Sequence, residues 1–167
     1  MRIVDSFLQE LDQEAKATRR LLERVPNDRL SWKPHPKSMT LGQLALHLAN
    51  INGGVSGMGV HDTCSLSPNA FNVPQPSSTT EIVAAFEKGL GEAKERLNGV
   101  DDGKILAGWS MTAGEKTIAS MPRVALYRAL MCNHQYHHRG QLTVYLRMLD
   151  VLLPSVYGPS ADENPFM

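Results

Sequence analysis

The feature that most constrains the fold is a long helical pattern near the carboxyl end of the chain, at residues 122–149. Apolar residues recur there every three or four positions, Ser120 is a suitable N-cap, and Pro122 fits a first helical turn. Three further segments have the same periodicity: residues 5–25, 41–52 and 78–98. Four such helices in 167 residues predict one all-α domain, a four-helix bundle that spans the whole chain.

Start and stop signals set the expected helix ends. Pro26 ends the first helix, and Thr40 with Gln43 forms a capping box at the start of the second. A cluster of glycines is expected to stop the second helix near Gly53 and Gly54. The connection from there to residue 78 is long and rich in proline, so it can cross the bundle end to end and let the second and third helices run parallel.

A different pattern precedes the fourth helix, between residues 104 and 120. Trp109 and Met111 belong to an alternating stretch, and Ala113-Gly114 provides a turn. We expect a small β-hairpin there.

Charge and cysteine content exclude several classes of protein. Lys plus Arg and Asp plus Glu both number 17, so no basic field attracts nucleic acid or an anionic membrane. The amino terminus resembles no signal peptide, and no apolar run is long enough to span a bilayer. Cys64 and Cys132 are too few for a disulfide scaffold and are expected to be reduced thiols. These features predict a cytoplasmic protein with no nucleic-acid or membrane partner.

Three histidines lie on the expected inward faces of two helices. His134 and His138 are four residues apart, about 40° on a helical wheel, so both can bind one ion. His47 lies on the inward stripe of the second helix. The residues that share the face of His134 are Tyr127, Leu130, Gln141, Tyr145 and Met148. Cys132 and Arg139 fall mostly on the opposite side.

Neutral imidazoles are good ligands for zinc, nickel, iron or copper, and three of them leave coordination positions open for water or substrate. A structural zinc site would close its tetrahedron with a fourth protein ligand, and none is evident here. The sequence therefore predicts a reactive divalent-metal site.

Other interpretations of these side chains remain open. A histidine on an apolar face is often only hydrogen-bonded within the core. His137 is three residues after His134, and that pair could also chelate a metal. His35 and His61 fall in loops, where solvation is expected. Gln141 and Tyr145 either donate hydrogen bonds near the metal or serve packing.

Several blocks of sequence resemble those of the DinB family. The most specific runs from His134 through His137-His138-Arg139-Gly140-Gln141 to Arg147. The other blocks are residues 154–163, Arg24-Val25-Pro26, residues 32–39 and residues 44–48. The resemblance implies a bundle in up-down-down-up order, a homodimer, and a metal held by His47, His134 and His138. It also implies that His137 lies outside this ligand set.

The same resemblance implies an activity, because related families include transferases that use low-molecular-weight thiols such as bacillithiol and mycothiol. The expected function is a divalent-metal enzyme, with zinc or nickel favoured, that transfers a small thiol to an electrophile. Metal-activated hydrolysis is an alternative, but an HExxH motif and an inward carboxylate base are both missing. A metal-binding stress-response dimer without catalysis is the third possibility. No catalytic residue is assigned from the sequence.

Overall fold

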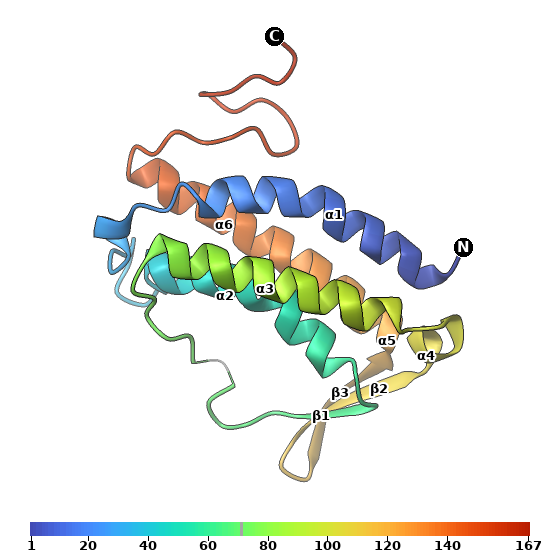
Figure 1. Ribbon diagram of the computed structural model, residues 1–167. Coiled ribbons are helices and arrows are strands. Elements are labelled where there is room, and N and C mark those ends of the chain that lie inside the picture. Colours follow the sequence, from blue (N-terminus) through green and yellow to red (C-terminus); the bar gives the residue numbers. More distant parts are fainter. Residues whose placement is uncertain (71) are drawn as a thin grey trace.

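The computed structural model describes residues 1–70 and 72–167 and is mostly helical, with one small sheet (Figure 1). The long helices are α1 (Ile3–Leu22), α2 (Leu41–Met58), α3 (Thr79–Asn98) and α6 (His134–Met148). The shorter ones are η1 (Asn27–Arg29), α4 (Asp102–Leu106), α5 (Arg123–Leu126) and η2 (Tyr127–Asn133). The strands are β1 (Thr63–Ser65), β2 (Gly108–Ala113) and β3 (Lys116–Pro122). None of the helices described combines the length and apolar character needed to cross a membrane.

Helix α2 lies at the centre of the molecule, where it contacts α3, η2 and α6. Its start is the predicted capping box: the Thr40 side chain accepts from the Gln43 N–H, and the Gln43 side chain accepts from the Thr40 N–H, each at 3.1 Å. Apolar residues from Leu41 to Val55 are buried on most of its sides. A helix that is apolar nearly all round is stable only when other elements cover it.

The glycines do not stop α2 where the sequence predicted, since the helix continues through Gly53 and Gly54 to Met58. Gly53 instead allows α2 and α3 to approach closely: a Cβ added there would lie 2.9 Å from the Cα of Gly89. A helix-interior glycine costs about 1 kcal/mol relative to alanine. The packing of α2 against α3 offsets that cost. Helix propensity, which depends on the local sequence, could not reveal this packing.

The predicted hairpin is present as β2 and β3, which pair antiparallel with a register shift after Met111. It begins later than expected because residues 102–106 form helix α4. The sequence also missed β1, which pairs parallel to β2 and completes a three-stranded sheet in the order β1-β2-β3. The connection after α2 is therefore partly ordered by pairing with a strand far along the chain.

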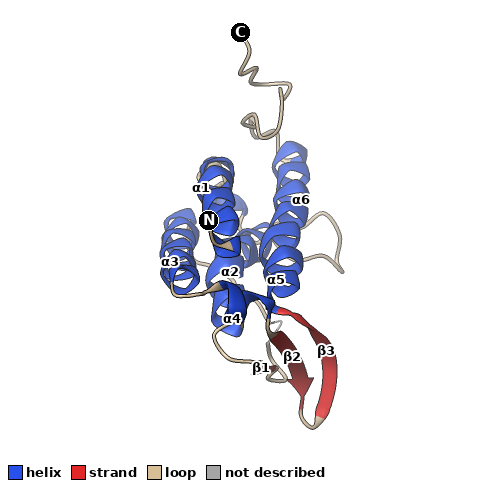
Figure 2. Cartoon of the chain, turned by 90° about the vertical axis from the view of Figure 1, so that its right-hand side faces the viewer, coloured by secondary structure: helices blue, strands red, loops and turns tan. Residues whose placement is uncertain are grey.

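A buried arginine joins this sheet to the helices. Arg123 is fully buried at the start of α5, and its guanidinium donates to the Gly59 carbonyl at 2.8 Å, the Lys104 carbonyl at 2.6 Å and the Asp62 carboxylate at 2.6 Å. These acceptors belong to the end of α2, to α4 and to the turn before β1. The arrangement holds the sheet at one end of the helices (Figure 2).

The fourth predicted helix is not one regular α-helix. After β3 the chain forms α5, then a π-helical segment over Tyr127–Asn133, and then α6. A π turn is wider than an α turn, so it changes which face later side chains occupy. Met148, which the sequence placed facing the core, is instead 56% exposed in the last turn of α6.

Two adjacent glycines give a matched test of the α2–α3 packing. Gly53→Ala should lower the free energy of unfolding by about 1–3 kcal/mol, because the new methyl group meets backbone and the helices must separate. Gly54→Ala should be neutral or stabilising by about 0.5–1 kcal/mol, since a Cβ there has no heavy atom within 4 Å. Urea unfolding of both variants measures the difference. Equal stability of the two would contradict this account.

Candidate metal centre

Three imidazole side chains converge between α2 and α6. His47 comes from α2, and His134 and His138 come from the first two turns of α6. The Nε2 atoms of His47 and His134 are 3.4 Å apart, and those of His134 and His138 are 2.7 Å apart. All three candidate ligand atoms lie within 4.8 Å of one another. The sequence prediction thus named the same three histidines that the fold brings together.

The surroundings favour neutral imidazoles, the form that binds metals. Burial lowers the pKa of His138 to about 4, with a smaller contribution from the neighbouring histidines. Burial also lowers the pKa of His47 and of His134 below the ordinary value for histidine. At neutral pH each ring therefore has a nitrogen lone pair available.

A hydrogen bond orients one of these rings. The Nδ1 atom of His138 is 2.7 Å from the Oε1 atom of Gln141, one turn further along α6. With the N–H of Nδ1 donating to this oxygen, the lone pair of His138 lies on Nε2, which faces His134. This contact places Gln141 beside the site, as an acceptor and not as the donor that the sequence suggested.

Tyr145 takes the packing role instead. Its ring meets Trp32 edge-on with the centroids 5.7 Å apart, and its hydroxyl is 3.4 Å from the Met39 carbonyl oxygen. Tyr145 therefore holds α6 against the loop before α2.

The rotation of α6 is set on its other side by Arg139. This side chain is only 2% exposed and lies 2.6 Å from the carboxylate of Glu14 on α1. A buried charge of this kind is costly unless it is paired. The pair keeps Arg139 toward α1 and thereby keeps its neighbour His138 toward α2.

The other candidate ligands lie outside the cluster. His137 is exposed on α6 and is not among the grouped ligand atoms of the described residues. His35 and His61 are exposed in loops, as predicted. Cys132 is buried, and burial raises the pKa of its thiol to about 12, so it remains protonated.

The donor set fits a divalent transition metal. Because a zinc–nitrogen bond is about 2.0–2.1 Å long, two nitrogens on a tetrahedral ion lie about 3.4 Å apart. The separation between His47 and His134 equals this value, whereas His134 and His138 would have to separate slightly. Within residues 1–70 and 72–167 the group contains no fourth histidine, cysteine or carboxylate. The site could therefore bind an ion and leave positions open.

A cavity of about 260 Å³ adjoins His47 and His134. Its walls come from α2, from β2, from η2 and from the segment that follows β1. The residues that line it beside the two histidines and Gly54 are mostly apolar: Asn50, Ile51, Val55, Met58, Leu66, Ala70, Met111 and Leu130. The sequence pattern gives no sign of this cavity, because the strand pairing that brings Leu66 and Met111 together has no local signal.

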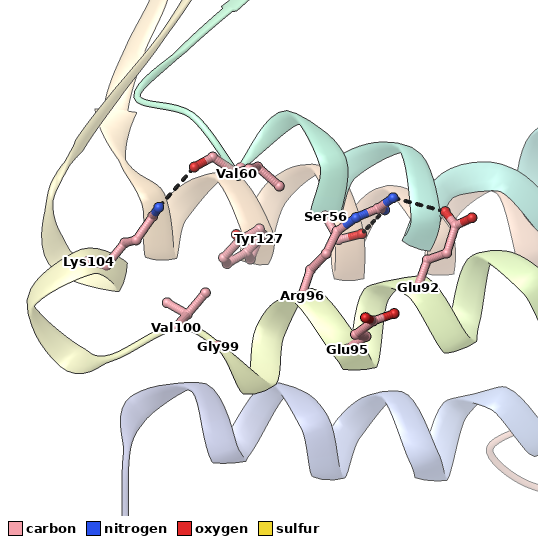
Figure 3. Close-up of a pocket in the computed structure, with 10 residues that line it drawn as sticks. Ser56, Val60, Glu92, Glu95, Arg96, Gly99, Val100, Lys104 and Tyr127 are labelled. Atoms are coloured by element: carbon pink, nitrogen blue, oxygen red, sulfur yellow. Dashed lines mark hydrogen bonds and ion pairs between the residues drawn. The ribbon is translucent and has the colours of Figure 1, made fainter.

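A larger cavity, of about 500 Å³, lies elsewhere, between α2, α3 and α4 (Figure 3). Two of its basic side chains already have partners within the cavity wall. Arg96 contacts Glu92 and Ser56, each at 3.1 Å, and Lys104 donates to the Val60 carbonyl at 2.9 Å. This cavity does not include the histidines, so its size does not make it part of the candidate metal centre.

The comparison with known families agrees with these features. The sequence profile described as DinB superfamily matches residues 10–142. The chain belongs to the DinB superfamily. It is similar to YrdA of Bacillus subtilis strain 168, with 27% identity over 96% of this chain and 91% of that protein.

Solved structures of DinB-like proteins share the fold. A DinB-like protein from Bacillus cereus ATCC 10987 aligns with a TM-score of 0.73 at 28% identity, over 92% of this chain and 97% of that one. The DinB-like YjoA of Bacillus subtilis aligns with a TM-score of 0.69 at 17% identity, over 90% and 96% of the two chains. The second likeness, at this low identity, bears on the fold alone.

Metal content tests the ligand assignment. Wild-type protein should bind about one divalent transition-metal ion per chain, and His47→Ala, His134→Ala and His138→Ala should each lose most of it, because two imidazoles hold an ion far less well than three. His137→Ala is the matched control and should retain the metal. Elemental analysis after gel filtration gives the stoichiometry. Equal loss in His137→Ala, or none in His47→Ala, would contradict the assignment.

A separate test concerns Gln141. Gln141→Ala should weaken metal affinity about 10–100-fold, because the ring of His138 loses the acceptor that fixes its tautomer. Gln9→Ala, at an exposed position on α1, should have no effect. Competition with a chromophoric chelator measures both affinities. An unchanged affinity in Gln141→Ala would show that the hydrogen bond does not support the site.

Proposed function

We propose that this protein is a divalent-metal-dependent enzyme that transfers a low-molecular-weight thiol to an electrophile. The observation that carries the proposal is the convergence of three neutral imidazoles, with no anionic ligand grouped with them in the described part of the chain. Family membership supports the same reading, since the DinB superfamily match covers both His47 and the α6 histidines.

The charge of such a site favours an anion. Three imidazoles contribute no negative charge, so a bound divalent ion keeps its full charge and attracts an anionic ligand. When bound, the ion lowers the pKa of a thiol or of water at its open position. Charge alone does not choose between these two nucleophiles.

The residues beside the histidines favour the thiol. Metal-activated hydrolysis commonly needs a general base that accepts a proton from water. No Asp or Glu is among the residues that line the cavity next to His47 and His134. A thiol, with a pKa near 8.5 before any perturbation, ionises much more readily than water and needs less help from a base.

The roles of the chain's own residues follow from these contacts. His47, His134 and His138 would hold the ion, Gln141 keeps the donor atom of His138 facing it, and the mostly apolar cavity offers space for an uncharged group beside them. In the overall reaction the thiol sulfur forms a bond to carbon as the bond from that carbon to its leaving group breaks. The thiol proton and the leaving group depart to solvent.

A turnover screen tests this function. Bacillithiol, mycothiol, glutathione and coenzyme A would each be offered with monochlorobimane, whose chloride is the leaving group, with and without a chelator. Metal-dependent thiol consumption is expected in the wild type and in His137→Ala, and its loss is expected in His138→Ala. Full activity in a folded, metal-free His138→Ala protein would overturn the proposal. Hydrolysis without any thiol would point to the other chemistry.

Further properties belong to the same proposal. We propose the up-down-down-up order for the four long helices; in its support, the chain in Figure 1 runs in one direction along α2 and α3 and in the other along α1 and α6. We also predict a single domain, a homodimer, a cytoplasmic location, and zinc or nickel as the metal. They rest on the sequence and on the resemblance to DinB proteins.

A further inference from the structure

We propose that the substrate converted at the histidine site has an uncharged apolar group, about the size of one aromatic ring, that binds in the cavity beside His47 and His134. This inference rests on the proposed function, because it takes the histidines as the reacting end of the site. It specifies the substrate class, which neither the fold nor the family determines.

The lining of the cavity carries the argument. Side chains of Ile51, Val55 and Met58 project from α2, and Met111 and Leu130 close the space from β2 and η2. No Lys, Arg, Asp or Glu is among the residues that line it, and Asn50 is the one uncharged polar side chain besides the two histidines. A charged group placed against these side chains would lose part of its hydration, and none of the lining residues carries a charge to pair with it, which is unfavourable.

The size of the cavity limits the occupant. An engineered apolar cavity of about 150 Å³ in another protein binds benzene. The cavity here measures about 260 Å³, so one ring or a short branched alkyl group fits and a large polycyclic body does not. Two of the histidines form part of the cavity wall. A substrate whose apolar group binds in the cavity can therefore present its reactive atom to the candidate metal centre.

The glycines of two helices provide a matched pair of variants. Gly54 lines the cavity, and a Cβ built on it meets no heavy atom within 4 Å, so Gly54→Leu adds apolar volume at the cavity wall from a Cβ that displaces nothing. Gly91 on α3 is equally free of neighbours and lines none of the cavities described above, so Gly91→Leu is the control. Leu66→Asp is a second, independent variant that places a carboxylate in the wall.

The experiment uses the metal-loaded protein with ¹³C-methyl methionine and toluene as the probe, because toluene has the apolar ring without the thiol. Toluene should shift the methyl resonances of Met58 and Met111, which line the cavity, and leave that of the exposed Met148 unchanged. Gly91→Leu should behave like the wild type. Gly54→Leu and Leu66→Asp should each bind toluene at least tenfold more weakly while keeping their metal.

A second arm compares thiols. Ethanethiol, propanethiol and butanethiol should bind about fourfold more tightly for each added methylene. 2-Mercaptoethanesulfonate, which is larger than ethanethiol but charged, should bind no more tightly than ethanethiol. Absence of toluene shifts, shifts that persist in both Gly54→Leu and Leu66→Asp, or equal binding of the charged thiol would overturn the inference. Toluene binding without turnover of any thiol would uphold the apolar site and refute the proposed thiol transfer, so the two failures are distinguishable.

Discussion

The burial of α2 is the constraint on which the rest of the structure depends. This helix is apolar on nearly every side, so it must be covered by α3, by α6 and by the segments that flank the sheet. Gly53 lets α3 approach closely on one side. His47 lies on another side, where α6 covers it. The same packing that stabilises the core therefore brings a polar ring of α2 into contact with two rings of α6, at a partly buried position.

The partial burial of the histidines and the apolar lining beside them each have a chemical consequence. Burial lowers the pKa of all three histidines, most strongly that of His138, so they remain neutral and able to bind a metal at physiological pH. The adjoining cavity is lined mostly by apolar side chains, which favours uncharged groups next to a bound ion that would favour an anion. A thiol with an apolar substituent, or an apolar electrophile that meets a thiol, satisfies both conditions. Substrate choice and metal chemistry would then be consequences of one packing arrangement.

Buried polar side chains fix the directions that hydrophobic packing leaves free. Apolar contacts are not directional and tolerate sliding and rotation of a helix. Arg139, paired with Glu14, fixes the rotation of α6, and Arg123 fixes the sheet against the end of α2. Each guanidinium would be very costly to bury in any other register, because its partners would be lost. Arg139 thereby places the helix that carries two of the histidines, and Arg123 places the sheet that contributes Met111 to the adjoining cavity.

The sequence by itself determined what depends on neighbouring residues: the long helices, the capping box at Thr40, the hairpin around Met111, and the pairing of His134 with His138 by helical spacing. It also selected His47, with help from the likeness to DinB proteins. Only the tertiary structure decided that α2 continues through Gly53, that a π-helical segment precedes His134, that β1 pairs with β2, and that Gln141 rather than Tyr145 contacts a histidine. The reason is physical: covalent geometry sets which residues share a helix face, whereas contacts between distant segments depend on the packing of the whole chain.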